Sequence, residues 1–174
     1  MAIINQFNIG IKMPPQVPQG TQVSLSITPQ PLMFRGLNLP VEISTASAFR
    51  QPPNPLPLTS IVVLAHFDTG ASITSIDLSL AKHLGLNPTG QAISHTAAGA
   101  QNTPTFAVDI SFPNTNLTPF QNLQIGSCQL PFNLQLALKG SGNAQNFGLL
   151  IGRDIMSRWN IIWNGPSSSV TISD

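Results

Sequence analysis

The stretch "TSIVVLAHFDTGASITSI", residues 59–76, decides the fold that we expect for this chain. Residues 59–67 are rich in β-branched side chains and apolar on both faces, which is typical of a strand in the interior of a sheet. Asp68-Thr69-Gly70 interrupts the apolar run, and residues 71–76 read as another short strand. Taken alone, this triplet indicates only a turn, because Asp and Gly favour turns for local reasons.

Most of the remaining chain also has the pattern of short strands. Leu39, Val41 and Ile43 alternate with other residues in 37–49, which is the pattern of a half-buried strand. Residues 50–58 are a proline-rich loop, since each proline lacks the N–H that a central strand needs. Further strands are predicted in a hairpin at 90–112 with a tip of small residues, a second hairpin around Gly126 within 117–138, a buried strand at 146–152 and a closing hairpin at 160–174.

Two short helices complete the expected mainly-β fold. The first covers residues 77–86, with Asp77 as its N-cap and Gly85 as its C-cap. The second is one or two turns within residues 153–159. The buried face predicted for the first helix is formed by Leu78, Ala81 and Leu84.

The N-terminal segment predicts an addition to this domain. Two β-like runs, Ile3–Ile11 and Gln22–Thr28, are separated by a proline-rich stretch and indicate an extended arm or a hairpin. We therefore divide the chain into an N-terminal extension, residues 1–36, and one domain, residues 37–174.

The composition excludes several classes of partner. Charged residues are 7% of the 174, the net charge is +1 and no basic cluster exists, so neither nucleic acid nor a membrane surface is an expected partner. The longest apolar run, residues 61–65, is too short to span a bilayer, and the N-terminus does not resemble a signal peptide, so we expect a cytoplasmic protein. One cysteine and three scattered histidines predict no intrachain disulfide, no metal site and no cofactor.

Two of the acidic residues call for a reason beyond solubility. Asp68 follows the strongest apolar strand, and Asp154 follows the second strongest. Asp77 is explained as a helix cap, whereas Asp109 alternates with apolar residues and is predicted to point to solvent. Near this pair lie His66 and His95, which we interpret as strand histidines with satisfied hydrogen bonds.

With "FGLLIGRDIM" at residues 147–156 as a second motif, the chain resembles the retropepsin-like aspartic proteases, the single-domain group that includes retroviral proteases and their bacterial and cellular relatives. The resemblance covers about residues 37–173 and has four elements in the family's order. They are Asp68-Thr69-Gly70-Ala71-Ser72, the helix at 77–86, the flap-like "SHTAAGAQNTPTF" at 94–106, and "LLIGRDIM" at 149–156 with the strands that follow.

This resemblance implies a closed, orthogonal β-barrel with a flap hairpin and one or two short helices. It also implies a homodimer in which each subunit supplies one Asp68, and in which the two carboxylates share a proton and activate a water molecule for peptide hydrolysis. The implied activity is that of an aspartic endopeptidase acting on peptide or protein substrates. The N-terminal extension then either covers a sheet edge or is removed by self-cleavage.

The family's pattern assigns roles to the residues around Asp68. Thr69 is expected to form hydrogen bonds across the dimer, and Gly70 to let the backbone pass close to the substrate. Ala71 and Ser72 border the main chain of the substrate. The flap tip is assigned to Gly99 with its neighbours Ala98 and Ala100.

A supporting loop is implied at Ile151, Gly152, Arg153 and Asp154. Gly152 allows tight packing against the Asp68 loop, Asp154 caps the following helix, and Arg153 donates to the dimer interface. Retroviral proteases usually carry an acid at the position of Ser72, which pairs with the arginine that Arg153 matches. Arg153 therefore needs another acceptor here, such as Asp154, a carbonyl group or a chain terminus.

Other interpretations stay open at this point. The same fold can serve as a non-catalytic module that binds a peptide or a partner chain by strand addition, with Asp68 kept for geometry. A third possibility is a structural protein that assembles into large oligomers. Cys128 is predicted to be a free thiol in a turn, and Trp159 and Trp163 are predicted to anchor the core or the dimer interface.

Overall fold

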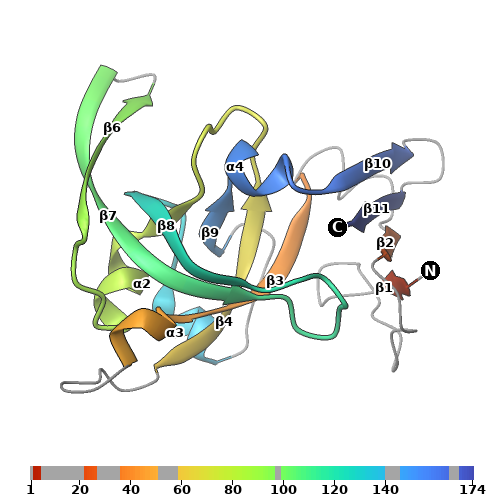
Figure 1. Ribbon diagram of the computed structural model, residues 1–174, viewed down its shortest axis with the longest axis horizontal. Coiled ribbons are helices and arrows are strands. Elements are labelled where there is room, and N and C mark those ends of the chain that lie inside the picture. Colours follow the sequence, from red (N-terminus) through yellow and green to blue (C-terminus); the bar gives the residue numbers. More distant parts are fainter. Residues whose placement is uncertain are drawn as a thin grey trace.

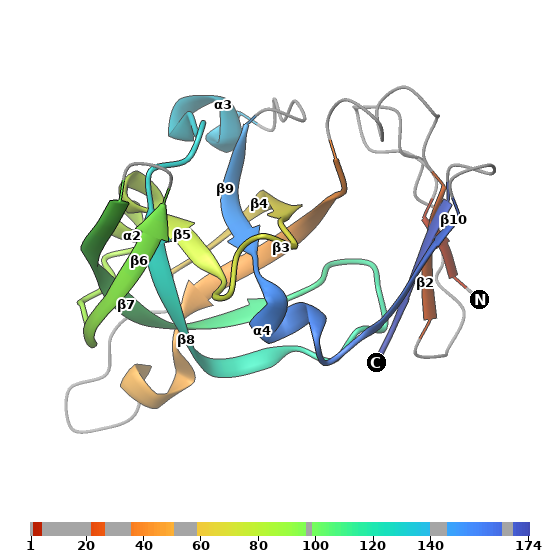
Figure 2. The ribbon, with the colours of Figure 1, turned by 90° about the horizontal axis from the view of Figure 1, so that it is seen from above.

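The computed structural model describes residues 2–4, 22–26, 36–50, 59–96, 99–139, 146–164 and 169–174. Most of the predicted proline-rich loop, and Ala98 of the predicted flap tip, lie outside the described residues. The described part of the chain is mainly β, with a barrel and a smaller four-stranded sheet beside it (Figures 1 and 2).

Six strands of the larger sheet close into a barrel. In chain order the sheet contains β3 (Asn38–Thr45), β4 (Ser60–Phe67), β5 (Ser75–Asp77), β6 (Gly90–Thr96), β7 (Gly99–Ser111), β8 (Phe120–Cys128) and β9 (Phe147–Ile151). Their spatial order is β3-β4-β9-β5-β8-β7-β6, and an additional pairing of β3 with β7 closes the ring and leaves β6 outside it (Figure 1). The closed, mainly-β fold predicted from the sequence is confirmed.

Alternating apolar residues fill the interior of the barrel. Leu39, Val41 and Ile43 of β3 are fully buried, as their spacing predicts. Strand β4 lies between β3 and β9, and its residues 63–65 are buried. Because β4 has a neighbouring strand on each side, Asp68 directly follows a strand that is held along both edges.

Short helices connect the strands: η1 (Ser47–Arg50, a 3-10 turn), α2 (Leu78–His83), α3 (Leu134–Leu138) and α4 (Arg153–Met156). Helix α2 begins as predicted, with the Asp77 carboxylate accepting a hydrogen bond from the Ser79 N–H. It ends at His83 with Leu84 as its C-cap, one residue before the C-cap predicted at Gly85, and Gly85 follows with a φ of 65°, the left-handed conformation that glycine favours. None of the helices in the described ranges is long and apolar enough to cross a membrane.

The buried face predicted for α2 is wrong in part. Leu78 is 46% exposed, whereas Leu80, Ala81 and Leu84 are buried. Positions 78, 81 and 84 drift around a helix of 3.6 residues per turn, while positions 80, 81 and 84 share one face. The packed face is therefore set by the helical period rather than by a spacing of three.

Residues 117–138 do not form the predicted second hairpin. Strand β8 continues through Gly126, Ser127 and Cys128 because these residues pair with β5 in parallel. The Gly126 N–H donates to the Thr74 carbonyl oxygen at 2.9 Å, so the small residues mark a close approach of two strands. Cys128 consequently lies in a strand and not in a turn, and the segment ends in α3, with Asn133 as its N-cap.

The smaller sheet joins both ends of the chain. It contains β1 (Ala2–Ile4), β2 (Gln22–Ser26), β10 (Asn160–Asn164) and β11 (Ser169–Ser173), in the order β1-β2-β11-β10 (Figure 1). The closing hairpin of β10 and β11 is confirmed. Strands β1 and β2 are parallel, so they are not the two arms of one hairpin. The domain boundary proposed between residues 36 and 37 stays a prediction.

Candidate active site

The Asp68 loop begins at the carboxyl end of β4. Strand β4 runs parallel to β9, and the Asp68 N–H continues their ladder by donating to the Ile151 carbonyl oxygen at 3.1 Å. The two apolar runs therefore end at the same edge of the sheet. This arrangement brings residues 68–72 against residues 151–154, which are the two motifs that the sequence singles out.

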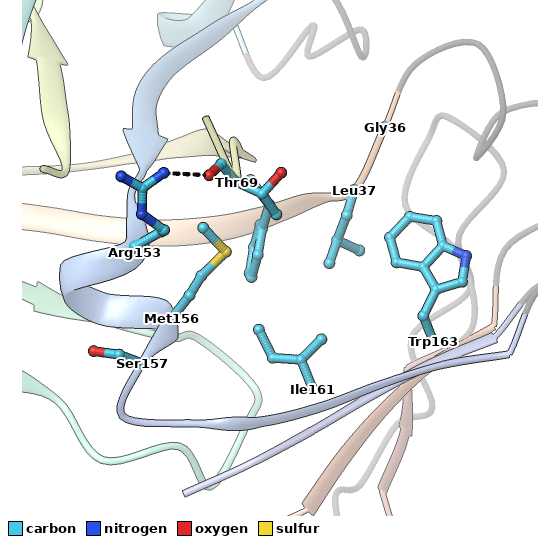
Figure 3. A pocket seen from close by; sticks show the side chains of 9 residues that line it. Gly36, Leu37, Thr69, Arg153, Met156, Ser157, Ile161 and Trp163 are labelled. Carbon is cyan, nitrogen blue, oxygen red and sulfur yellow. Dashed lines mark hydrogen bonds between the residues drawn. The ribbon is translucent and has the colours of Figure 1, made fainter. Parts of the chain in front are cut away.

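Backbone and side-chain hydrogen bonds fasten this loop to α4. The Arg153 N–H donates to the Ala71 carbonyl oxygen at 3.0 Å, and Arg153 Nη1 donates to the Thr69 carbonyl oxygen at 2.6 Å (Figure 3). Of the acceptors that the sequence left open for Arg153, the structure places a carbonyl group there. Ser72 is exposed, and the acid that the resemblance stated from the sequence would place at this position is not needed to hold Arg153.

Gly152 lies where no side chain would fit. A Cβ atom at this position would lie 2.6 Å from the Ile73 carbonyl carbon and 2.8 Å from the Thr74 nitrogen, both backbone atoms. Its N–H donates to Thr74 Oγ1 at 3.1 Å. Glycine is therefore required for the Asp68 loop to pack directly on the end of β9, as predicted.

Asp154 acts differently from the prediction. The N-cap of α4 is Gly152, and Asp154 lies within the first turn of the helix. Its Oδ1 accepts hydrogen bonds from Thr74 N, Thr74 Oγ1 and Ile155 N, at 2.8 to 2.9 Å. The carboxylate thus ties α4 to the chain leaving the Asp68 loop. Thr74 is fully buried and has no local sequence signature beyond a hydroxyl within an apolar run, so sequence reasoning missed it.

The carboxylate of Asp68 has fewer partners than the other aspartates of the barrel. Its Oδ1 accepts from the Gly70 N–H at 2.7 Å, and no donor among the described residues reaches its Oδ2. Three other aspartates each accept three hydrogen bonds from described residues: Asp77, Asp109 and Asp154. Asp68 thus keeps an oxygen available at the surface of a rigid loop.

Asp109 contradicts the prediction that it points to solvent. Its side chain is 14% exposed and pairs with Arg50 at 2.6 Å. It also accepts hydrogen bonds from Ser47 N and Asn122 N. Alternation identified the face of β7 on which Asp109 lies, but the partners on that face come from η1 and β8.

The ring of His66 is held between β3 and β9. Its Nδ1 lies 3.0 Å from Asn38 Oδ1, and its ring stacks on Phe147 with centroids 4.8 Å apart. Burial lowers the pKa of His66 from the ordinary value of 6.5, and the charge of Asp68 offsets part of that effect. The hydrogen-bonded strand histidine expected from the sequence is found here, whereas the side chain of His95 lies outside the described residues.

The predicted flap corresponds to the β6–β7 hairpin, which projects from the barrel (Figure 1). The pairing runs from Gly90 and Thr105 out to Thr96 and Gly99. Gly99 has φ of 110°, a backbone conformation that side chains disfavour, and Gly99 and Ala100 are exposed. The predicted tip thus falls at the outer end of this hairpin.

An open hollow of about 520 Å³ lies beside the Asp68 loop (Figure 3). Most of its lining is apolar, and Trp163 is 51% exposed there. Trp159, in contrast, is buried and packs against Phe67 and Phe112. The two tryptophans are therefore different, one in the core and one on the hollow. The hollow is lined by Gly36, Leu37, Phe67, Thr69, Arg153, Met156, Ser157, Ile161 and Trp163.

A family model described as aspartyl protease matches residues 60–152. The chain belongs to the aspartyl protease family. The resemblance stated from the sequence is therefore confirmed at this level, and the matched residues begin with β4 and end at Gly152.

Solved structures of viral and bacterial proteases are also similar to this member of the aspartyl protease family. The solution structure of Simian Foamy Virus (mac) protease is 13% identical, with a TM-score of 0.35, and the match covers 68% of this chain and 89% of that chain. The crystal structure of a retropepsin-like aspartic protease from Rickettsia conorii is 12% identical, with a TM-score of 0.37 and coverage of 78% and 91%. No curated protein matches the chain.

Other reactive side chains are less suited to chemistry in this aspartyl protease family member. Burial and the nearby charge of Asp77 raise the pKa of the Cys128 thiol to about 11, so little thiolate forms at neutral pH. The described residues contain no group of three or more His, Cys, Asp or Glu that could hold a metal ion. Asp68 is the strongest candidate for a reacting group.

Proposed function

We propose that this protein is a homodimeric aspartic endopeptidase in which two Asp68 carboxylates, one from each subunit, activate water to hydrolyse a peptide bond. The observation that carries the proposal is the available oxygen of Asp68 on a loop fastened to β9 and α4. The sequence contains one Asp-Thr-Gly triplet, so the second carboxylate comes from a second copy of the chain.

The chemistry follows from bringing two carboxylates together. Two adjacent carboxylates do not both ionise readily, so the pair shares one proton and titrates as a unit. The ionised member removes a proton from the water between them, while the protonated member donates a hydrogen bond to the scissile carbonyl group. The water attacks the amide directly, and no covalent enzyme intermediate forms.

The face beside Thr69 supports docking of a second copy. The hollow that contains Thr69 is mostly apolar and includes the exposed ring of Trp163. Ile161, two residues before Trp163 on β10, lines the same hollow. Covering apolar side chains of this kind removes them from water, which favours association of two copies. On this face the two Thr69 side chains would meet and hold the Asp68 loops together.

Substrates of this site are extended peptides with bulky apolar side chains beside the cleaved bond. The β6–β7 hairpin is the flap in this proposal, and it would close over such a peptide and exclude water. Its exposed Ile93 (64%) supplies an apolar surface on that hairpin.

The first test is cleavage of an unfolded protein from about pH 3 to about pH 7, where carboxyl pairs of this kind act. Asp68→Asn should lower cleavage by about a thousandfold or more, since a neutral amide is not a general base. Asp174→Asn is the matched control, because Asp174 is exposed and accepts a hydrogen bond from Thr118 N in another part of the chain. Full activity of the Asp68→Asn variant would exclude the proposal.

Mixing the two forms tests the shared site. Equal amounts of wild type and Asp68→Asn protein should exchange subunits and lower the cleavage rate to about half that of the wild type alone, because mixed dimers lack one carboxylate. A site completed within one chain would keep the full rate, and that result would contradict the dimeric mechanism.

A further inference from the structure

The β6–β7 hairpin leaves the barrel at one point of β7. Residues 99–105 of β7 pair with β6, whereas pairing with β8 begins at Phe106. Among the strands that the structure describes, β6 has β7 as its only neighbour (Figure 1). A two-stranded ribbon is only marginally stable by itself, so contacts at the junction between Thr105 and Phe106 determine how firmly the hairpin is held.

The side chain of Gln124 bridges this junction from β8. In the β7–β8 register Gln124 lies opposite Ala107, so Thr105 is its diagonal neighbour on the same face. Gln124 Nε2 donates to Thr105 Oγ1 at 2.9 Å, and also to Thr89 Oγ1. Thr89 directly precedes β6, so one amide group contacts both arms of the hairpin where they leave the barrel.

Thr105 lies at the centre of the remaining contacts at the junction. Its carbonyl oxygen accepts from Thr89 N at 2.8 Å and from Thr89 Oγ1 at 3.2 Å. Its side chain is buried, and its Oγ1 would lie 3.2 Å from a Cβ atom at Gly90. Ser127 Oγ donates to the neighbouring Pro104 carbonyl oxygen at 2.7 Å. Two side chains of β8 therefore hold the hairpin in addition to the backbone ladders.

We propose that Gln124 is a positioning residue for the β6–β7 hairpin, and that its two hydrogen bonds hold the hairpin at the angle from which it closes over a bound peptide. The proposal rests on the flap role proposed for this hairpin. Without the amide group, both arms lose their link to Gln124, and the hairpin opens more often. The Asp68 loop keeps its own hydrogen bonds to β9 and α4, so binding of the peptide suffers more than the chemical step.

The first experiment follows the hairpin itself and does not depend on activity. Backbone hydrogen exchange is measured by NMR in the wild type, in Gln124→Leu and in Gln121→Leu. In Gln124→Leu the amides of residues 91–103 should exchange roughly fivefold faster, as expected for the loss of one net hydrogen bond, while those of β4 stay unchanged. Gln121, an exposed glutamine near the other end of β8, is the matched control. Equal exchange of the hairpin in wild type and Gln124→Leu would overturn the proposal.

A second set of variants identifies the contact through which Gln124 acts. Thr105→Val removes the hydroxyl but keeps the branched shape, whereas Thr105→Ser keeps the hydroxyl and should exchange like the wild type. The double variant with Gln124→Leu and Thr105→Val should exchange about as fast as Gln124→Leu alone, because both changes remove the same hydrogen bond. If the two single effects multiplied instead, a role through Thr105 would be contradicted.

The third experiment measures the consequence for cleavage. Gln124→Leu should raise KM roughly fivefold and change kcat by less than about twofold, while Gln121→Leu should leave both unchanged. An unchanged KM in a folded Gln124→Leu variant would overturn the positioning role, while the Asp68 mechanism would stand. If the wild type cleaves nothing under any condition, the proposed function fails, and hydrogen exchange still decides whether Gln124 holds the hairpin. Thermal unfolding of each variant establishes that the protein compared is folded.

Discussion

Asp68 directly follows strand β4 and Asp109 lies in strand β7 of the same barrel, but their carboxylates have opposite surroundings. Asp109 is 14% exposed, pairs with Arg50 and accepts from two backbone N–H groups. Asp68 accepts from one N–H of its own loop, although β9 and α4 hold that loop firmly. The fold uses the Asp109 charge for its own stability, whereas around Asp68 it stabilises the backbone and leaves the charge available.

Because of this difference, the loss of stability on removing a carboxylate can be measured separately from the loss on disturbing the backbone that holds it. A saturated carboxylate leaves several donors unsatisfied when it is removed. A carboxylate with one local partner leaves few. Functional groups are commonly held in this way, by a rigid surrounding that does not depend on the reactive atom itself.

The largest loss of stability is expected from Gly152→Ala, which directly disturbs the backbone that holds the Asp68 loop. Its Cβ would lie 2.6 Å from a backbone atom of Ile73, so strands must shift and the free energy of unfolding should fall by about 3 kcal/mol or more. Gly148→Ala is the comparison and should cost less, since the atoms nearest to its Cβ would belong to the Leu80 and Phe132 side chains and not to the backbone. Urea unfolding of both variants makes the comparison, and similar losses would contradict it.

Next comes the direct comparison of the two aspartates. Asp109→Ala should lower the free energy of unfolding by about 2 to 3 kcal/mol, because Arg50, Ser47 N and Asn122 N lose their acceptor. Asp68→Ala should change it by about 0.5 kcal/mol or less while abolishing cleavage. Equal destabilisation in chemical unfolding would mean that Asp68 is a structural residue like Asp109.

Most of the barrel could be predicted because the alternation of buried and less buried residues along a strand appears in the sequence as alternating apolar residues. The alternation of Leu39, Val41 and Ile43 and the apolar run before Asp68 both correspond to observed strands. Two of the errors, at residues 126–128 and at Asp109, arose where a partner far along the chain decides the outcome. Small residues at 126–128 resemble a turn, but their parallel neighbour β5 explains them. Asp109 was predicted to be exposed because the alternation of residues in its strand does not reveal that Arg50 pairs with it on that face.

For the candidate site, the motifs located both loops but not what joins them. Residues 68–72 and 151–154 were predicted, and the β4–β9 ladder brings them together. Thr74, just before β5, and Asn38 of β3 were missed, since a single hydroxyl or amide beside or within a strand has no pattern of its own. Their roles follow only from the pairing of strands, which local sequence does not encode.

Thr74→Val tests the hydrogen bonds that join β9 and α4 to the chain leaving the Asp68 loop, and the expected loss of stability is smaller. Valine keeps the shape but removes the hydroxyl that accepts from Gly152 N and donates to Asp154. The buried Gly152 N–H then has no acceptor, and the free energy of unfolding should fall by about 1 to 2 kcal/mol. Thr74→Ser keeps the hydroxyl and should lose less in the same unfolding measurement. If serine were as damaging as valine, packing of the methyl group would be the cause.

The smallest effect is a dependence of stability on pH at His66. Burial lowers its pKa below the unfolded value of 6.5, so the unfolded chain binds the proton more readily as the pH falls. The contribution of neutral His66 to stability is therefore complete above pH 6.5 and is lost as the pH falls through the lowered folded pKa of His66. The charge of Asp68 limits this loss, so Asp68→Asn should make it larger, and His66→Phe should remove it. Urea unfolding at several pH values measures the slope of stability against pH.

Asp109→Ala is the control for this slope. It lowers stability by a larger amount but should leave the His66 contribution to the slope unchanged, because the charge that acts on His66 is that of Asp68. A change in slope from Asp109→Ala as large as that from Asp68→Asn would mean that the two regions are not electrostatically separate.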